Sequence, residues 1–411
     1  MNIQQAALAI VRRLREHGHE ALFAGGCVRD MLLKIEPKDF DIATSARPEE
    51  IVALFTRTKQ VGAQFGVVMI GQSRHWIETA TFRTDLDYQD GRRPEHVAFT
   101  TATEDARRRD FTINGLFYNP IAEKVIDYVD GQADLDAGVI RAIGDPAQRF
   151  AEDHLRMLRA VRFAARLDFK IEKDTAAAIK AHAERMVRIS AERIREELQR
   201  ILTHHSRPRG VRLLRELDLI EHLGIGDAWP ADRVEDAANV IGRLPKVTDF
   251  VTSLAGLLHD CSATEVKQIA RTLRCSNEQV GDLAWLLTHL HDPERAKTLS
   301  LADIKRLLVH ARVNDLLKLH HAVRDTHGLS LDGYHEFITR RNAVAPKDIA
   351  PPPLVTGDDL LALGYEPGPI FKQVLDNLYD AQLNEAIVSK SEALRRLSEL
   401  TGIQSADQKS R

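Results

Sequence analysis

The chain has 411 residues, of which 44% are hydrophobic, and its formal net charge is −3. This length and composition predict a soluble, globular protein of two to four domains. The three cysteines, Cys27, Cys261 and Cys275, lie far apart without a CxxC motif or a Cys/His cluster, which excludes a disulfide framework and a structural zinc site.

The first 20 residues predict an amphipathic helix of mixed charge and not a secretory leader. No run of 18 apolar residues occurs in the sequence, so no membrane span is predicted. We therefore expect a cytoplasmic protein without a membrane partner.

Two patterns divide the chain. Short apolar or alternating runs lie between helical segments from about residue 20 to 130, and after Pro146 segments with a helical period follow one another. The expected fold class is α+β, with a mixed sheet and helices first and an all-helical remainder.

A glycine pair follows the first predicted strand, in LFAGGCVRDMLL. Gly25 and Gly26 predict a tight turn that opens a helix, where backbone N–H groups can meet an anion and Arg29 can meet a phosphate. A Gly-Gly pair alone is usually only a turn.

The next predicted strand, KDFDIATSA, carries two acids at alternate positions. Asp39 and Asp41 share one face while Phe40 and Ile42 face the core. Two carboxylates this close repel each other unless cations lie between them, and Mg²⁺ prefers such oxygen ligands. Together with the glycine turn, this pair predicts a triphosphate held next to two metal ions that assist transfer at the α-phosphorus. Here the chain resembles the nucleotidyltransferases of DNA polymerase beta type.

Glu78, in HWIETATF, lies on a later predicted strand and is a candidate third metal ligand. A single acid on an exposed strand face is the more common explanation.

A capping box at Thr101 to Glu104 predicts a helix that carries the arginines of ARRRDFTINGLF. Arg108 and Arg109 are candidate phosphate ligands. Asp110 and Asn114 lie one predicted turn apart beside them, which favours a polar cluster over a solvated basic turn.

A stripe of charged residues follows in RFAEDHLRMLRAVRFAARL. Its spacing of three or four residues predicts one helical face, made of Asp153, Arg156, Arg159, Arg162 and Arg166. Like charges on one face are unfavourable without an anion, so the stripe predicts a phosphate-bearing ligand, with solvation as the alternative. From Arg141 to Arg215 there are 18 Lys and Arg against 10 Asp and Glu, a second sign of a phosphate partner.

The acid at the start of the stripe also suggests base selection. Cytosine and adenine present an amino donor beside a ring-nitrogen acceptor, whereas uracil and guanine present the reverse. Asp153 accepts and Arg156 donates, so the pair matches C and A and mismatches U and G.

Six motifs in this order resemble those of the class II tRNA nucleotidyltransferases and the related bacterial poly(A) polymerases. They are GGCVRD, KDFDIAT, RRDFTIN, DGQADLDAGVIRAIGDPAQRF, EDHLRMLRAVRFAARL and ISAERIREEL. The resemblance implies a nucleotidyltransferase head over residues 1–145, a helical neck over 146–220, a body over 221–350 and a tail over 351–411. It also implies Mg²⁺ on Asp39 and Asp41, nucleotide contacts from the glycine turn and the arginines, CTP and ATP as substrates and the tRNA 3′ end as partner, and no protein partner is expected.

The short segment FRTDLDYQDGRRPEHVAF resembles the flexible loop of CCA-adding enzymes and favours that branch over poly(A) synthesis or the addition of CC alone. The intact acid pair argues against an inactive RNA-binding homologue. His259 and Asp260 resemble the start of an HD-type phosphohydrolase site, but the following CSATEV lacks the expected Gly-Lys, so we expect no functional metal site there.

Overall fold

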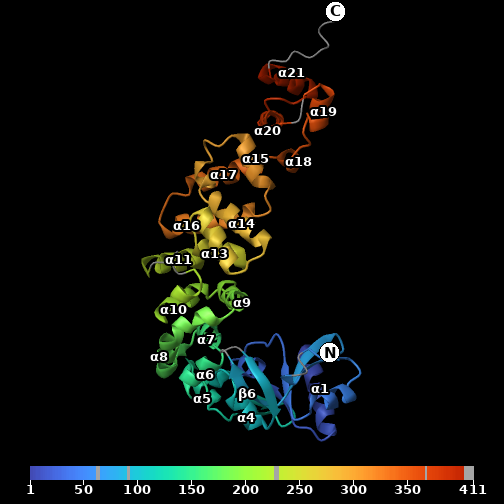
Figure 1. The fold of residues 1–411 in the computed structure, drawn as a ribbon, viewed down its shortest axis with the longest axis vertical. Coiled ribbons are helices and arrows are strands. Elements are labelled where there is room, and N and C mark those ends of the chain that lie inside the picture. Colours follow the sequence, from blue (N-terminus) through green and yellow to red (C-terminus); the bar gives the residue numbers. More distant parts are fainter. Residues whose placement is uncertain (62–64, 90–92, 226–230, 366–367, 402–411) are drawn as a thin grey trace, which may run out of the picture. The chain divides into compact units, whose positions relative to one another are not determined.

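The computed structural model describes residues 1–61, 65–89, 93–225, 231–365 and 368–401 (Figure 1). The chain divides into two compact units. The first comprises residues 1–238 and 268–276, and the second comprises residues 239–267 and 277–411.

The first unit contains a mixed sheet of seven strands in the order β3-β4-β5-β2-β1-β8-β9. The strand bounds are Ala21–Ala24 (β1), Asp41–Thr44 (β2), Thr58–Lys59 (β3), Val67–Gln72 (β4), His75–Thr81 (β5), Phe117–Asn119 (β8) and Lys124–Ile126 (β9). β2 runs antiparallel to β1 and parallel to β5, and all four residues of β1 are buried. The predicted acid strand thus lies at the centre of the sheet.

Short helices surround this sheet. They are α1 (Ile3–Glu16), α2 (Gly26–Leu32), α3 (Pro48–Leu54), α4 (Ala102–Arg107), α5 (Gly131–Ala137) and a 3-10 turn at Thr112–Asn114. α1 begins at a capping box formed by Asn2 and Gln5 and packs its apolar face on β1. α4 packs Ala102 and Ala106 into the cluster that also contains Phe117 of β8.

The helices after the sheet belong to the same unit. They are α6 (Pro146–Glu152), α7 (Arg156–Leu167), α8 (Lys173–His182), α9 (Ala191–Leu202) and α10 (Arg207–Glu216), with 3-10 turns at Ala183–Arg188 and Ile220–His222. α7 packs against both α9 and α10, and its Leu158 and Val161 are fully buried. Nε of Arg159 on α7 donates to Asp110, just before the 3-10 turn at Thr112–Asn114, and this bond ties the predicted arginine stripe to the sheet region.

Two strand pairs complete the first unit. β10 (Val139–Ile140) pairs in parallel with β11 (Lys170–Ile171). β6 (Arg83–Gln89) and β7 (Arg93–Phe99) form an antiparallel pair in which Arg83 lies opposite Phe99. This pair is the segment that resembles a flexible loop, and its residues 90–92 lie outside the described part of the chain.

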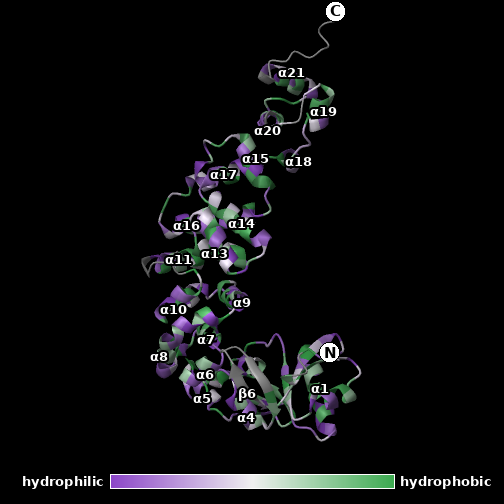
Figure 2. Cartoon of the chain, viewed as in Figure 1, coloured by the Kyte–Doolittle hydropathy of each residue, from purple (hydrophilic) through white to green (hydrophobic). Residues whose placement is uncertain are grey.

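The second unit is helical throughout its described residues. Its helices are α12 (Phe250–Leu257), α14 (Asn277–Thr288), α15 (Leu301–Val309), α16 (Val313–Thr326), α17 (Asp332–Ala343), α18 (Pro346–Ile349), α19 (Gly357–Ala362), α20 (Pro369–Leu383) and α21 (Lys390–Thr401), with a 3-10 turn at Asp292–Arg295. Two further helices, α11 (Ala231–Arg243) and α13 (Ala263–Thr272), run from one unit into the other. Hydrophobic and hydrophilic residues mix along these helices, as in any set of amphipathic helices (Figure 2). The last helices bury their own cluster, which includes Leu360, Leu378 and Leu397.

The α+β class with a mixed sheet followed by helices is therefore confirmed. Among the described residues no helix has both the length and the apolar character needed to cross a bilayer. The four-part division into head, neck, body and tail stays a prediction.

Candidate active site

Three carboxylates share one face of the sheet. β2 begins at Asp41, and Asp39 lies in the segment just before it. Phe40 and Ile42 are 3% and 1% exposed, while both aspartates are exposed, so the expected alternation of faces is confirmed. Ile42 pairs with Thr79 in the parallel register, which brings Glu78 of β5 beside Asp41.

The proximity of the other two acids alters the ionisation of Asp41. Partial desolvation in the site, followed by the negative charges of Glu78 and Asp39, raises the pKa of Asp41 to about 7, and Arg109 opposes this rise. A cation bound among the three groups would relieve the same repulsion. Oxygen ligands of this kind suit a hard divalent cation, so the residues present fit a metal ion.

Two of the carboxylates, Asp41 and Glu78, line a cavity of about 170 Å³. Its lining residues are Ala24, Asp41, Ile42, Val67, Glu78, Ala80, Arg83, Arg108 and Arg109. Acids thus form part of the wall and arginines another part. This distribution of charge suits an anionic ligand that is bound together with cations.

The glycine turn lies beside one of these arginines. Gly25 follows β1 with a φ of +70°, and α2 begins at Gly26, as predicted. A Cβ atom added to Gly25 would lie 2.9 Å from Nη1 of Arg109. The left-handed backbone favours glycine here, and a larger residue would have to displace the guanidinium of Arg109.

Arg108 and Arg109 are held by one buried acid. Asp105, which is 1% exposed, accepts hydrogen bonds from Nη2 of Arg108 at 2.6 Å and from Nη2 of Arg109 at 2.9 Å. Burial alone would raise the pKa of Asp105, but the two arginines hold it below its usual value. The expected helix through these arginines is wrong, because α4 ends at Arg107 and the chain turns where Arg108 and Arg109 fold back onto Asp105.

A chain of hydrogen bonds links the glycine turn to α7. Nη1 of Arg29 donates to Oδ1 of Asn114 at 2.6 Å, and Nδ2 of Asn114 donates to Oδ1 of Asp110 at 3.1 Å. Nε of Arg159 donates to the other oxygen of Asp110 at 2.8 Å. The predicted polar cluster of Asp110 and Asn114 is thus present, although Asn114 lies in a 3-10 turn and not on a continuous helix.

Asp110 is the buried centre of this chain. Burial would raise its pKa, but Arg159 and the hydrogen bond from Asn114 outweigh burial and lower it to about 2. Asp110 therefore stays ionised and fixes the side chain of Arg159.

One aromatic ring supports three of the arginines. The guanidinium carbon atoms of Arg29, Arg159 and Arg162 lie 5.2, 5.4 and 4.3 Å from the ring centroid of Phe163. Contact with the electron-rich face of an aromatic ring stabilises a cation. Phe163 thus allows three like charges to gather on one side of α7.

The charged stripe differs from its prediction in two respects. α6 ends at Glu152 and α7 begins at Arg156, so Asp153 lies between two helices and its side chain accepts a hydrogen bond from the backbone N–H of Leu155. The single helical face expected from Asp153 to Arg166 is therefore wrong at its start, because this local hydrogen bond competes with a helical turn.

The argument from unrelieved like charge is also wrong. Carboxylates of the chain itself pair with three of the arginines: Arg156 with Glu152 at 2.7 Å, Arg159 with Asp110 at 2.6 Å and Arg162 with Glu197 at 2.7 Å. Asp153 in turn pairs with Arg193 of α9 at 2.9 Å. The stripe does not need a ligand to be stable.

Sequence reasoning named Glu152 as a charge partner of the stripe but missed three others, namely Asp105, Arg193 and Glu197. Glu152 stands four residues before Arg156, a spacing that itself predicts an ion pair. Arg193 and Glu197 lie one turn apart in ISAERIREEL, but nothing in that motif indicates which side chains they meet.

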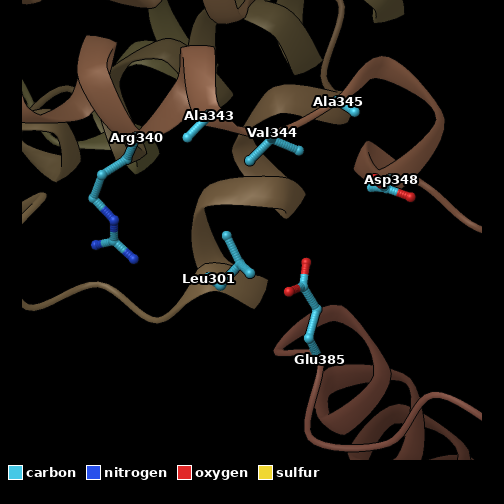
Figure 3. A pocket seen from close by; sticks show the side chains of 7 residues that line it. All are labelled: Leu301, Arg340, Ala343, Val344, Ala345, Asp348 and Glu385. Atoms are coloured by element: carbon cyan, nitrogen blue, oxygen red, sulfur yellow. The ribbon is translucent and has the colours of Figure 1, made fainter.

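A second cavity, of about 280 Å³, lies within the second unit (Figure 3). It is lined by Leu301, Arg340, Ala343, Val344, Ala345, Asp348 and Glu385. Arg340 donates to the carbonyl oxygen of Leu299, and Glu385 pairs with Lys305 at 3.1 Å. Because these charges already have partners, the cavity does not resemble a ligand site.

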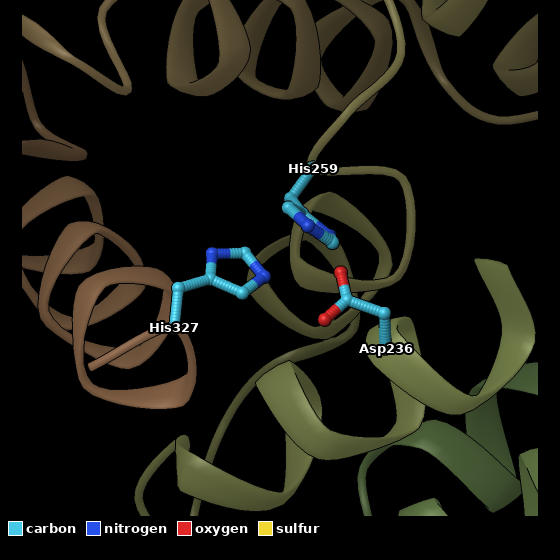
Figure 4. Close-up of side chains that lie close together, drawn as sticks. All are labelled: Asp236, His259 and His327. Carbon is cyan, nitrogen blue, oxygen red and sulfur yellow. The ribbon is translucent and has the colours of Figure 1, made fainter. Parts of the chain in front are cut away.

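His259 lies in the second unit near a second histidine. The ring centroids of His259 and His327 are 5.9 Å apart (Figure 4). Nδ1 of His259 lies 3.1 Å from the carbonyl oxygen of Gly256, and Asp260 contacts the sulfur of Cys261 at 3.9 Å. The expectation that these residues form no metal site stays a prediction.

Comparison with known proteins identifies relatives of the sheet region and of the helices that follow it. A family model described as the poly A polymerase head domain matches residues 21–141. A model described as the probable RNA and SrmB binding site of polymerase A matches residues 168–224. The CCA-adding enzyme of Geobacillus stearothermophilus is 34% identical over 392 residues, which cover 95% of each chain. That of Lactiplantibacillus plantarum is 40% identical over 278 residues, 67% of this chain and 68% of the relative.

Solved structures of CCA-adding enzymes superpose on this chain. The CCA-adding enzyme of Bacillus stearothermophilus in complex with CTP superposes with a TM-score of 0.81 at 28% identity, over 98% of both chains. The enzyme of Thermotoga maritima in complex with tRNA has a TM-score of 0.65 at 21% identity, which shows a shared fold alone.

Proposed function

This chain belongs to the family of CCA-adding enzymes, which are nucleotidyltransferases, and we propose that it adds C, C and A to the 3′ end of tRNA from CTP and ATP. The observation that supports the proposal is a cavity lined by Asp41, Glu78 and Arg109, in the same unit as the neighbouring residues Asp153 and Arg156. The 3′ oxygen of the RNA would form a bond to the α-phosphorus of the nucleotide, and pyrophosphate would leave.

The family implies the use of divalent metal ions. We propose Mg²⁺, with Asp39 and Asp41 as ligands and Glu78 as a third. When bound, the metal would neutralise charge on the triphosphate and on the leaving pyrophosphate. The raised pKa of Asp41 supports this assignment, because the negative charges of Glu78 and Asp39 disfavour the ionised form of Asp41 when no cation is bound.

The remaining site residues would bind the nucleotide in two ways. Arg109, which lies against the Gly25–Gly26 turn, would contact the triphosphate from the wall of the cavity. Asp110 and Asn114 are buried and would act by positioning Arg29 and Arg159. Arg162, which is held by Glu197, would support the same side of α7.

Asp153 and Arg156 would choose the base. The backbone N–H of Arg156 donates to the carbonyl oxygen of Asp153 at 3.0 Å, so the two residues are neighbours across one turn. The ion pair with Arg193 orients the side chain of Asp153, whose carboxylate oxygens can accept a hydrogen bond from an amino group of C or A. The arrangement therefore supports selection without a nucleic-acid template.

A nucleotide-addition assay tests the function. Purified protein with Mg²⁺ receives tRNA transcripts that end before CCA, after C and after CC, with each nucleoside triphosphate supplied separately. We expect C on the first two transcripts and A on the third. Long A tails on unrelated RNA without incorporation of C would instead assign poly(A) synthesis.

The metal assignment has its own variants. Asp39→Asn and Asp41→Asn should each abolish transfer while the protein stays folded by circular dichroism. Asp168→Asn is the matched control, since Asp168 pairs with Arg209 on the surface and is 84% exposed. Retained activity in either site variant would reject the assignment. The cytoplasmic location stays a prediction.

A further inference from the structure

The face of the sheet that carries the acids continues past them along β5. Trp76, Glu78 and Ala80 occupy alternate positions of this strand, so their side chains lie on one face. Ala80 lines the cavity together with the arginines, whereas Trp76 lies on the other side of Glu78, roughly 7 Å further along the strand. Trp76 is 37% exposed, which is unusual for so large an apolar side chain.

Two cations lie against the ring of Trp76. Nζ of Lys59 is 4.2 Å from the ring centroid, and the guanidinium carbon of Arg57 is 5.5 Å from it. Lys59 pairs with Met69 across β3 and β4, and Met69 pairs with Glu78 across β4 and β5, so Lys59 is on the same face as the acids. Contact with an aromatic ring stabilises a cation. Trp76 therefore holds two positive charges on the open face of the sheet.

A glycine makes room for one of these cations. Gly71 of β4 lies opposite Trp76, and a Cβ atom added to Gly71 would lie 3.1 Å from Cβ and 3.3 Å from the guanidinium carbon of Arg57. Nη1 of Arg57 donates to the carbonyl oxygen of Ser73 at 2.7 Å. The missing side chain at Gly71 thus lets Arg57 cross β4 and reach the tryptophan.

The charges of these two cations have no partner of opposite sign in contact with them. Arg57 and Lys59 are exposed, and neither forms an ion pair with any residue in the described part of the chain. We call the group of Arg57, Lys59, Gly71 and Trp76 the Trp76 surface. It offers positive charge beside the acids but outside the cavity.

The two sides of the acids differ in the proposed reaction. In nucleotidyl transfer the attacking and the leaving oxygen lie on opposite sides of the α-phosphorus. Arg109 would contact the triphosphate within the cavity, so pyrophosphate would leave on that side. The RNA 3′ oxygen must then approach from the other side of the acids, where the Trp76 surface lies.

We propose that the Trp76 surface binds the backbone phosphates next to the RNA 3′ end and so aligns the attacking 3′ oxygen with the acids. This inference rests on the proposed function, because it takes the direction of attack from it. Lys59 and Arg57 contact the phosphates, since exposed cations without a counter-charge release bound counterions when they meet RNA. Trp76 is a positioning residue, because it acts through these two cations.

Kinetics and binding of the full-length protein test this with a hairpin RNA whose single-stranded 3′ end stops before CCA. We expect Lys59→Ala and Arg57→Ala each to raise the KM for this RNA by about three- to five-fold, the effect of one exposed ion pair, with the KM for CTP unchanged. Trp76→Ala should raise it at least as much, and Trp76→Phe should restore most of the loss. The affinity measured by fluorescence anisotropy without nucleotide should fall by similar factors.

Uncharged linkages identify the phosphate. Three further hairpin RNAs each carry a methylphosphonate at one of the last three linkages. The wild type should lose affinity at one linkage, and Lys59→Ala should lose no further affinity when that same linkage is uncharged. Additive losses at all three linkages would overturn the inference.

Arg12→Ala is the matched control. Arg12 is an exposed arginine of α1, which packs on β4 and β5 from the side of the buried Ile77, opposite to the Trp76 surface, so its loss should change no RNA affinity. Unchanged RNA affinity in Lys59→Ala and Trp76→Ala would overturn the inference while the addition assay still supports the function. A raised KM for CTP with unchanged RNA affinity would assign the surface to the triphosphate and also overturn it. Since anisotropy needs no catalysis, a wild-type protein that binds RNA but adds no nucleotide would reject the function separately.

Discussion

At the scale of single residues, Asp41 should make stability depend on pH. Its pKa in the folded protein is about 7, above the ordinary value of 3.8. Its contribution is therefore fully present below about pH 4 and is lost as the pH rises through 7. Without divalent cations, the melting temperature of the wild type should fall relative to Asp41→Asn between pH 4 and 8, and Mg²⁺ should remove most of this difference. Parallel melting curves of the two proteins across this range would contradict the shared carboxylate site.

Asp110 should show the opposite dependence. Its pKa is about 2 in the folded protein, so its contribution is present above the ordinary value of 3.8 and is lost as the pH falls toward 2. Asp110→Asn should lower the free energy of unfolding by about 2 kcal/mol at pH 7, and by less at pH 3. Urea unfolding at both pH values measures this. Asp168→Asn, at an exposed ion pair, should show no such difference, and an equal loss at both pH values would mean that ionisation of Asp110 is not its cause.

At the scale of elements, the β1–Gly25–α2 turn should tolerate no side chain. Gly25→Ala introduces strain at a φ of +70° and a 2.9 Å contact with Arg109. Gly144→Ala is the matched control, because Gly144 has a φ of +75° but nothing within 4 Å of an added Cβ. Both variants should lose roughly 1 to 3 kcal/mol of stability, but Gly25→Ala alone should raise the KM for CTP and ATP, by about ten-fold or more. Equal nucleotide KM values in the two variants would show that Arg109 is not displaced.

The same elements show how far the sequence alone predicts this fold. The alternation of apolar and acidic residues was enough to predict the β2 strand and the outward orientation of Asp39 and Asp41, although Asp39 lies just before the strand, because an extended chain has only two faces. The end of α4 at Arg107 and the start of α7 at Arg156 were not predictable. The first depends on Asp105, and the second depends on the turn at Asp153. The ion pair between Asp110 and Arg159 joins residues 49 positions apart, so no local pattern indicates it.

At the scale of the whole molecule, two units with separate cores predict unfolding in two steps. Only the first unit carries the proposed nucleotide site, so CTP should raise the midpoint of its transition by preferential binding to the folded state.

The tryptophans separate the two signals, because Trp285 is the one tryptophan within the sequence of the second unit and Trp76 belongs to the first. In Trp285→Phe, tryptophan fluorescence reports the first unit, and calorimetry of the same sample reports both. With CTP and Ca²⁺, the fluorescence midpoint should rise while one calorimetric transition stays in place. In Asp41→Asn the rise should shrink, since the metal that bridges protein and triphosphate loses a ligand. A single transition that moves as a whole in both measurements would show that the two units unfold together.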